Sequence, residues 1–223
     1  MLGLSNIYRS VFDIIGPIMI GPSSSHTAGA VAIGRAANDL FGGIPERVIV
    51  HYYGSFAKTH RGHGTDYAIA AGVLGFDASD PRVPNSRQIA REQGVDIRFV
   101  EESGKSPIHH PNTAILDLIN EEKKVQISGC SIGGGTIEIR NIKLHGIDIE
   151  PTGPLSIVLY VTTNVGKDDG SSLVEDLKRL AQFDKKQVLK NDEYTIYEFD
   201  LKQQLQEGIR GFFVNKYENI ICL

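Results

Sequence analysis

The positions of apolar residues along the chain predict an N-terminal part in which helices and strands alternate. From Thr27 to Leu40, apolar side chains recur every three or four residues, which indicates a helix with one buried face. Gly29 and Gly34 would weaken this helix in isolation, and we expect them to permit the close approach of another backbone. The segment from Arg47 to Tyr53 is rich in β-branched and aromatic residues and is predicted to be a buried strand.

The alternation continues to about residue 150. We expect a polar, glycine-spaced loop over residues 54–66 and antiparallel hairpins over residues 114–148, where the triple glycine at 133–135 marks a turn. The segments in between are predicted as two short helices, a strand and an irregular stretch: residues 67–74 and 86–93, residues 96–102, and residues 103–112.

The pattern of apolar and polar residues changes after residues 151–154, where two prolines and a glycine mark a domain boundary. Beyond it the pattern predicts a strand, a helix opened by the capping box Ser172–Glu175, a hairpin, a second helix and a last strand: residues 155–162, 172–180, 187–199, 201–209 and 212–222. This βαββαβ order is that of a ferredoxin-like unit. We predict an α/β (α+β) fold with two domains, residues 1–150 and residues 151–223.

Composition and charge argue against several classes of function. The net charge of −4 and a pI near 6.0 give no electrostatic reason to expect nucleic acid or an acidic membrane surface as a partner. Apolar runs stay far short of the ~20 residues that span a bilayer, and residues 1–9 show no signal peptide. Two cysteines, Cys130 and Cys222, make no disulfide framework. We therefore expect a cytoplasmic protein without membrane contact.

Residues 21–29, with the sequence GPSSSHTAG, form a polar stretch that packing alone does not explain. Gly21 and Pro22 end the preceding apolar run, and the hydroxyl side chains that follow stand where a helix needs its cap. A helix start carries unpaired N–H groups and a partial positive charge, so it holds anions well. The stretch either caps the helix only or also forms a seat for a small carboxylate or phosphate.

Histidines point to the first domain as the place of the chemistry. All seven lie before residue 151, at positions 26, 51, 60, 63, 109, 110 and 145, so the second domain is expected to regulate or to assemble. His60 and His63 lie in a predicted loop without a carboxylate signature, so we predict no metal site in this chain. An iron–sulfur cluster needs several thiolates, which two distant cysteines do not supply.

Four motifs, in this order, resemble the beta chain of bacterial iron–sulfur-dependent L-serine dehydratase: residues 21–27, 62–66, 110–112 and 131–135. The resemblance covers roughly residues 8–140. It implies a partner alpha chain that supplies the cysteines of a [4Fe–4S] cluster, and a reaction that turns L-serine into pyruvate and ammonia through an enamine. Iron in the partner would act as the Lewis acid for the departing hydroxyl.

The reaction that the resemblance implies needs a base for the Cα proton of serine, and a histidine suits this task because imidazole ordinarily titrates near neutral pH. His63 is our first choice for this base. Gly62 and Gly64 would let the backbone approach the substrate closely. Thr65 and Asp66 either orient the His63 ring or cap the following helix. Gly64, Thr65 and Asp66 are therefore candidates for substrate binding. The alternative is that His63 is a solvated loop residue.

His26 is the second candidate catalytic residue. With its hydroxyl-bearing neighbours it would bind the substrate carboxylate or the cluster region of the partner: Ser23, Ser24, Ser25 and Thr27. Asn112 either donates to the substrate or, following Pro111, only forms a turn. His51 and His145 are expected to be structural.

The second domain resembles the ACT regulatory domain, but the loop at residues 164–170 lacks the proline of that family's pattern. Effector binding is therefore in question, while edge-to-edge pairing of such units would give a homodimer. One alternative function is a non-catalytic, amino-acid-binding regulatory subunit. Another is a pyridoxal-phosphate dehydratase, which lacks support because no lysine stands in a recognisable cofactor motif.

Overall fold

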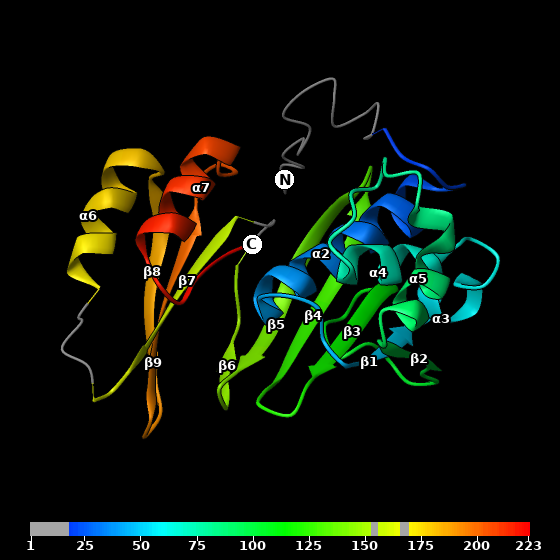
Figure 1. Cartoon of the computed structure of the whole chain (residues 1–223), viewed down its shortest axis with the longest axis horizontal. Helices are drawn as coiled ribbons and strands as arrows, with labels where there is room; N and C mark the ends of the chain where they lie inside the picture. The colour runs from blue at the N-terminus through cyan, green and yellow to red at the C-terminus, as the bar shows by residue number, and fades with distance from the viewer. Residues whose placement is uncertain (1–17, 153–155, 166–169) are drawn as a thin grey trace, which may run out of the picture.

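Two β-sheets carry the helices of this protein, in a computed structural model that describes residues 18–152, 156–165 and 170–223 (Figure 1). The first part of the chain contains η1 (Ser24–Ala28, a single π-helical turn), α2 (Gly29–Phe41), β1 (Arg47–Tyr53), α3 (Gly54–Thr59), α4 (Thr65–Val73), η2 (Val83–Asn85), α5 (Ser86–Glu92), β2 (Asp96–Glu101), β3 (Asn112–Ile119), β4 (Lys124–Gly133), β5 (Thr136–Leu144) and β6 (Ile147–Ile149). The second part contains β7 (Ile157–Thr163), α6 (Ser171–Leu180), β8 (Phe183–Lys190), β9 (Tyr194–Leu201), α7 (Glu207–Lys216) and β10 (Ile220–Cys222).

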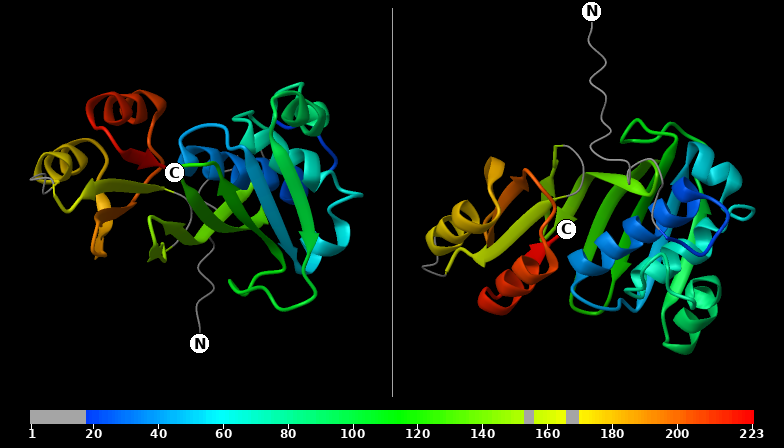
Figure 2. Two further views of the ribbon diagram at one scale, coloured as in Figure 1. Left: turned by 60° about the horizontal axis from the view of Figure 1, so that its bottom comes forward. Right: turned by 90° about the horizontal axis from the view of Figure 1, so that it is seen from above.

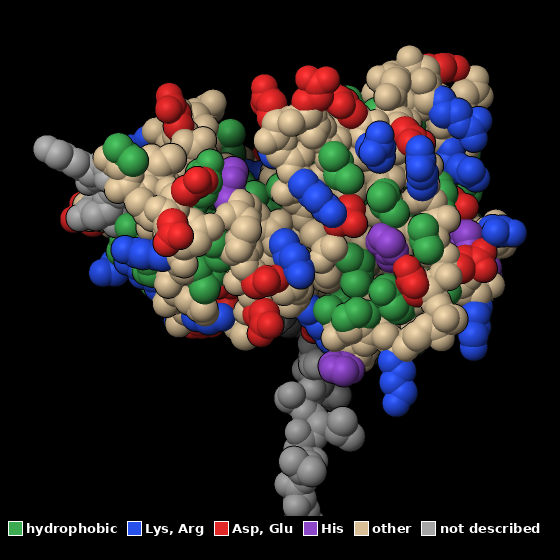
Figure 3. All heavy atoms as spheres, turned by 90° about the horizontal axis from the view of Figure 1, so that it is seen from below, with side chains coloured by type: hydrophobic (Ala, Val, Ile, Leu, Met, Phe, Trp, Pro, Cys, Tyr) green, Lys and Arg blue, Asp and Glu red, His purple; other side chains and the backbone are tan. Residues whose placement is uncertain are grey.

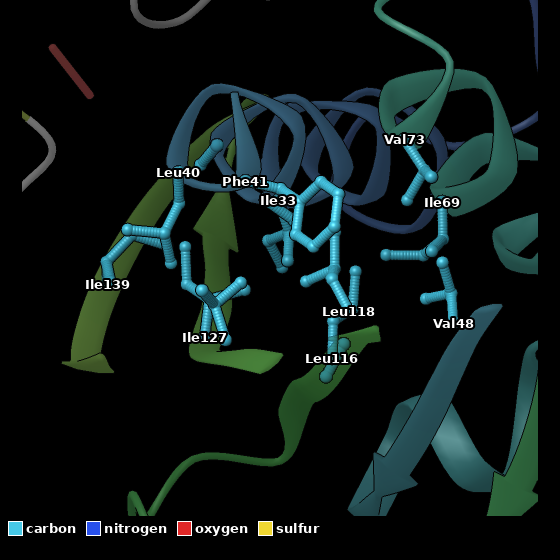
Figure 4. Close-up of a cluster of buried hydrophobic side chains, with 14 of the residues drawn as sticks. Ile33, Leu40, Phe41, Val48, Ile69, Val73, Leu116, Leu118, Ile127 and Ile139 are labelled. Atoms are coloured by element: carbon cyan, nitrogen blue, oxygen red, sulfur yellow. The ribbon is translucent and has the colours of Figure 1, made fainter. Parts of the chain in front are cut away.

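The first sheet has the strand order β2-β1-β3-β4-β5-β6. β1 and β2 run parallel, and the remaining neighbours are antiparallel. Helices α2 and α4 lie over one face of this sheet. Their apolar side chains meet those of the strands in a continuous core, as Figure 4 shows for Ile33 of α2, Ile69 of α4 and Leu116 of β3. Burial of this kind stabilises a fold by ~25 cal/mol per Å² of apolar surface.

Close packing of α2 against α4 depends on two glycines. A Cβ added at Gly34 would collide with the backbone of α4, and one at Gly72 would collide with the backbone of α2. The expected close approach at Gly34 is thereby confirmed, and Gly72 is its counterpart on the other helix.

The second sheet has the order β10-β7-β9-β8, with every pair antiparallel. It follows the predicted βαββαβ sequence of a ferredoxin-like unit, so the α+β fold is confirmed. Helices α6 and α7 lie at the end of the molecule away from α4 and α5 (Figures 1 and 2).

Alternate residues of β7 pack in two different cores, because successive side chains of a strand point to opposite faces of the sheet. Val158 and Tyr160 pack in the cluster formed with α6 and α7, whereas Ile157 and Leu159 belong to the same hydrophobic cluster as α2 and the first sheet. An ion pair of 2.7 Å between Arg210 of α7 and Asp39 of α2 adds to this junction. Because the two sheets share a core, the division into domains at residues 1–150 and 151–223 stays a prediction.

Several predicted boundaries are wrong. The expected loop over residues 54–66 contains the helix α3. The expected strand over residues 212–222 begins inside the helix α7, and β10 is limited to its last residues. Ile209 and Phe213 pack in the second core at a spacing of four, while Phe212 and Val214 are exposed, so helical periodicity prevails over β propensity. The residues predicted as a helix from 201 begin instead with the end of β9.

The N-terminal end of one helix also differs from expectation. Helix α6 begins at Ser171 with Gly170 as its N-cap, so Ser172 lies inside the helix and the predicted capping box is wrong. The part of the loop at residues 166–169, like the boundary residues 153–155, lies outside the described residues. In the described part of the chain, no helix combines the length and the apolar character that crossing a bilayer requires.

Candidate functional site

His26 and His63 come together in the folded chain. Their ring centroids lie 4.8 Å apart with the rings nearly perpendicular. His26 is part of η1 and is half-buried, whereas His63 is exposed on the turn between α3 and α4. The two candidate catalytic residues are far apart in the sequence and are therefore neighbours only through the fold.

Ser23 holds the turn that presents His26. Its Oγ accepts a hydrogen bond of 3.2 Å from the backbone N–H of His26, and its carbonyl accepts one of 2.8 Å from the N–H of Thr27. A hydroxyl at this position satisfies donors that a helix start leaves unpaired. Ser23 therefore caps the turn η1, whereas α2 itself follows Ala28 without a side-chain cap, so the predicted capping holds only for the turn that precedes α2. Ser24 and Ser25 lie in the same turn, and their side chains are outside the description.

The His26 ring lies between two hydroxyls. Its Nδ1 lies 3.4 Å from Ser23 Oγ, and its Nε2 lies 3.4 Å from Ser55 Oγ. Burial and the positive charge of a protonated His63 lower the pKa of His26. The neutral ring is therefore favoured near neutral pH, and a neutral imidazole has one nitrogen that donates and one that accepts a hydrogen bond. Sequence reasoning missed Ser55 because it lies in the segment predicted as a loop.

Thr27 is fully buried, and its side chain contacts the backbone of the site. Its Oγ1 donates a hydrogen bond of 3.3 Å to the carbonyl of His63. This bond ties η1 to the turn between α3 and α4, so Thr27 fixes the approach of the two histidines.

One of the two glycines beside His63 is required by the backbone. Gly64 has φ 73°, in the left-handed region, and an added Cβ would collide with the ring of Tyr67. Gly62 has open space around it, with Thr59 O as the nearest atom to an added Cβ at 3.9 Å.

Asp66 and Thr65 take positions different from those expected. The Oδ1 of Asp66 lies 2.6 Å from Nδ1 of His60, so this carboxylate is placed on His60 rather than on His63. Gly64 is the N-cap of α4 and no side chain caps that helix, so the predicted capping role of Thr65 or Asp66 is wrong. The Oγ1 of Thr65 is buried without a hydrogen-bond partner among the described residues.

Asn112 joins the third motif to the fourth. Its Nδ2 donates a hydrogen bond of 3.3 Å to the carbonyl of Ser131, and its backbone N–H donates one of 3.1 Å to Nδ1 of His110. Pro111 O accepts a bond of 2.7 Å from the N–H of Ser55, the residue that contacts His26. A chain of contacts therefore connects all four motifs.

Ser131 is a further residue that our sequence-based choice of site residues left out. Its Oγ is buried and has no hydrogen-bond partner in the part of the chain that the structure describes. A buried hydroxyl without a partner costs about 1–3 kcal/mol, so Ser131 and Thr65 are suited to receive a polar group of a ligand.

The two thiols of the chain do not fit an iron–sulfur cluster. Cys130 lies in β4 and Cys222 in β10, so they belong to different sheets, and burial raises the pKa of each thiol to about 11. Cluster ligation requires several converging thiolates. Within residues 18–152, 156–165 and 170–223, no three His, Cys, Asp or Glu side chains gather as metal ligands would.

Two further features concern the surface of the molecule. A cavity of about 700 Å³ is lined by His60, Arg61 and Glu101, among others, but by neither His26 nor His63. Figure 3 shows one face of the molecule, on which basic and acidic side chains are interspersed.

Comparison with known proteins supplies the family. The family model of the serine dehydratase beta chain matches residues 10–141, a span that contains all four motifs. The chain is 53% identical over 154 residues to the probable L-serine dehydratase beta chain of Bacillus subtilis, covering 69% of this chain and 68% of that protein. It is 41% identical over 152 residues to the L-serine dehydratase beta chain of Peptoniphilus asaccharolyticus, covering 67% of each.

A longer relative contains a similar segment. L-serine dehydratase 2 of Escherichia coli is 46% identical over 129 residues, which are 55% of this chain and 28% of that protein. The resemblance drawn from the motifs is confirmed, because the family model matches more than half of the chain. This chain belongs to the family of serine dehydratase beta chains.

Proposed function

We propose that this chain is the beta subunit of an L-serine dehydratase and converts L-serine into pyruvate and ammonia together with an alpha chain. The contact between His26 and His63, assembled from two motifs and linked to the other two, is the observation that carries the proposal. The names of the relatives supply the substrate.

His63 would act as the general base. Its ring accepts the proton from Cα of serine, the bond between Cβ and the hydroxyl oxygen breaks, and the departing hydroxide takes a proton from solvent to become water. The resulting enamine tautomerises to an imine, which water hydrolyses to pyruvate and ammonia. The exposed position of His63 favours contact with a substrate, and the ring of His26 lies beside it with the two ring centroids 4.8 Å apart.

Polar groups around the pair would bind the substrate. The start of η1, with Ser24 and Ser25, is the proposed seat of the carboxylate, where backbone N–H groups favour an anion. The unpartnered hydroxyls of Thr65 and Ser131 are the proposed contacts for the polar groups of serine. In the structure the side chain of Asn112 donates a hydrogen bond to the carbonyl of Ser131. It would therefore either position the Ser131 backbone for the substrate or contact the substrate after its side chain rotates.

The [4Fe–4S] cluster is proposed to belong to the alpha chain, because the buried thiols of this chain do not fit it. The longer Escherichia coli protein supports a site completed by additional sequence, since the segment similar to this chain is only 28% of it. An alpha chain that covers the exposed His63 would close the site. We also propose a cytoplasmic location and a homodimer through β8, the edge strand of the ACT-like sheet.

Anaerobic co-purification with the alpha chain, followed by an assay of pyruvate formation, tests the proposal. The complex should be active, and this chain alone, reconstituted with iron and sulfide, should form no pyruvate. His63→Ala and His63→Asn should abolish turnover of the complex. Near wild-type turnover of both variants at saturating serine would favour the alternative, a non-catalytic regulatory subunit that binds amino acids.

A further inference from the structure

His60 lies at the start of the turn that carries His63, and both of its ring nitrogens face carboxylates. Nδ1 lies 2.6 Å from Oδ1 of Asp66 in α4, and Nε2 lies 2.9 Å from Oε1 of Glu101 in β2. The residue is only 3% exposed. The ring therefore links the far side of the turn to the edge strand of the first sheet.

His60, Asp66 and Glu101 form a cluster that we call the clasp. A neutral imidazole donates from one nitrogen only, so both hydrogen bonds form together when the ring carries a proton on each nitrogen. Arg61 contacts the Glu101 carboxylate at 2.9 Å, and Arg87 lies 3.7 Å from that of Asp66. These cations balance the two carboxylates, and the ring of Tyr52 packs 4.9 Å from the ring of His60.

The clasp closes a very short turn. The N–H groups of Gly62 and His63 both donate to the carbonyl of Thr59 at 3.0 Å, and the N–H of Thr65 donates to the carbonyl of His60 at 3.0 Å. The side chains of residues 60 and 66 then join the two ends of the same turn. The position of His63 at its tip follows from that closure and from the bond that Thr27 makes to the His63 carbonyl.

We propose that His60, held by Asp66 and Glu101, is a positioning residue that fixes the His63 ring for proton abstraction. The inference rests on the proposed role of His63 as the base. Both ring nitrogens of His60 are engaged by these carboxylates, so the role proposed for it is to hold the turn and not to exchange protons with the substrate. Because a misplacement of about 1 Å costs about 100-fold in rate, loss of the clasp should lower turnover more than substrate binding.

The test uses the complex with the alpha chain and the variants His60→Ala, Asp66→Asn and Glu101→Gln. We expect kcat to fall by about 10- to 100-fold in His60→Ala and Asp66→Asn, with KM changed by less than about threefold. Glu101 is half-exposed whereas Asp66 is buried, so water can compensate for the contact weakened in Glu101→Gln, and this variant should retain most of the turnover. Arg98→Gln, which removes an exposed arginine from the same strand β2, is the matched control and should leave kcat unchanged.

Amide hydrogen exchange over residues 59–66 gives a readout that does not depend on activity. Exchange there should become faster in His60→Ala and Asp66→Asn and stay unchanged in His63→Ala. Normal kcat in the first two variants, or unchanged exchange over the turn, would overturn the positioning role even if their thermal stability fell. Should His60→Ala fail to fold, the near-isosteric Asp66→Asn decides the question. Wild-type turnover of His63→Ala would instead reject the proposed function.

Discussion

His26 Nε2 lies 3.4 Å from Ser55 Oγ, and this contact joins the serine-rich motif to the helix that follows β1. Ser55 also donates its backbone N–H to Pro111 O at 2.7 Å, so one residue touches two of the motifs. Gly54 makes this possible with φ 58°, because an added Cβ would collide with the backbone of Pro111.

Ser55→Ala should lower kcat of the complex by about three- to tenfold, since it removes a hydroxyl that orients the His26 ring while a single hydrogen bond contributes only about 0.5–1.5 kcal/mol. Steady-state kinetics check this, with the exposed Ser103→Ala as a control that should behave like wild type. An unchanged kcat in Ser55→Ala would show that the His26 orientation does not depend on this contact.

Gly64→Ala and Gly62→Ala form a matched pair on either side of His63. Gly64→Ala combines a left-handed φ with a collision against Tyr67 and should destabilise the chain by about 1–3 kcal/mol. Gly62→Ala meets open space and should change stability by less than about 0.5 kcal/mol. Urea unfolding of both variants measures the difference, and equal stabilities would contradict the assigned backbone requirement.

A second pair of glycines tests the crossing of α2 and α4. Gly72→Ala should cost several kcal/mol, because its Cβ would meet the backbone of α2, which has no flexible end to move away. Gly211→Ala in α7 has nothing within 4 Å of its added Cβ and should stabilise by up to about 1 kcal/mol through helix propensity. Thermal unfolding of the two variants should therefore shift in opposite directions.

Glu198 should make the fold less stable as the pH rises. Its carboxyl is buried, neither oxygen has a hydrogen-bond partner among the described residues, and burial with the nearby charge of Asp200 raises the pKa of Glu198 to about 7. The unfolded state releases this proton at lower pH than the folded state, so the free energy of unfolding falls between the ordinary glutamate pKa, about 4.3, and pH 7.

Glu198→Gln removes this dependence, since the amide does not ionise. At pH 8 the variant should be more stable than wild type by on the order of 2 kcal/mol, and at pH 5 the two should differ much less. Urea unfolding across this range measures the effect. A wild-type chain whose stability rises steadily from pH 5 to pH 8 relative to Glu198→Gln would reverse the assigned sign.

Cys130 and Cys222 should resist thiol reagents in the folded chain. Both thiols are buried, and their pKa of about 11 leaves very little thiolate at neutral pH. Titration with a chromogenic disulfide should detect both cysteines only after denaturation. Fast labelling of either thiol in the native chain would contradict the burial described for β4 and β10.

Secondary structure was predicted best from the sequence where the residues of an element alone determine whether it is a helix or a strand. Helix α2 and strand β1 follow from periodicity and residue type between Gly29 and Tyr53, and the ferredoxin-like order follows from the succession of elements. The segment after Leu201 was mispredicted because Phe212 and Val214 suggest a strand, whereas the burial of Phe213 against the second core decides for a helix.

The site was predicted in part for a similar reason. The motifs brought His26 and His63 to notice, but the partner of Asp66 is His60, and Glu101 lies on a strand that no local pattern connects with that ring. Ser55 and Ser131 enter through contacts between distant segments, which spacing along the chain does not encode.

The core shared by the two sheets has a consequence for any shortened form of this protein. Ile157, Leu159 and Ile196 of the second sheet complete the hydrophobic cluster that includes Ile33 and Leu40 of α2. A fragment limited to the family-matched residues 10–141 would lose those side chains and expose an apolar face to water. Such a fragment should self-associate. The second sheet therefore keeps the part that carries the histidines soluble by covering its apolar face.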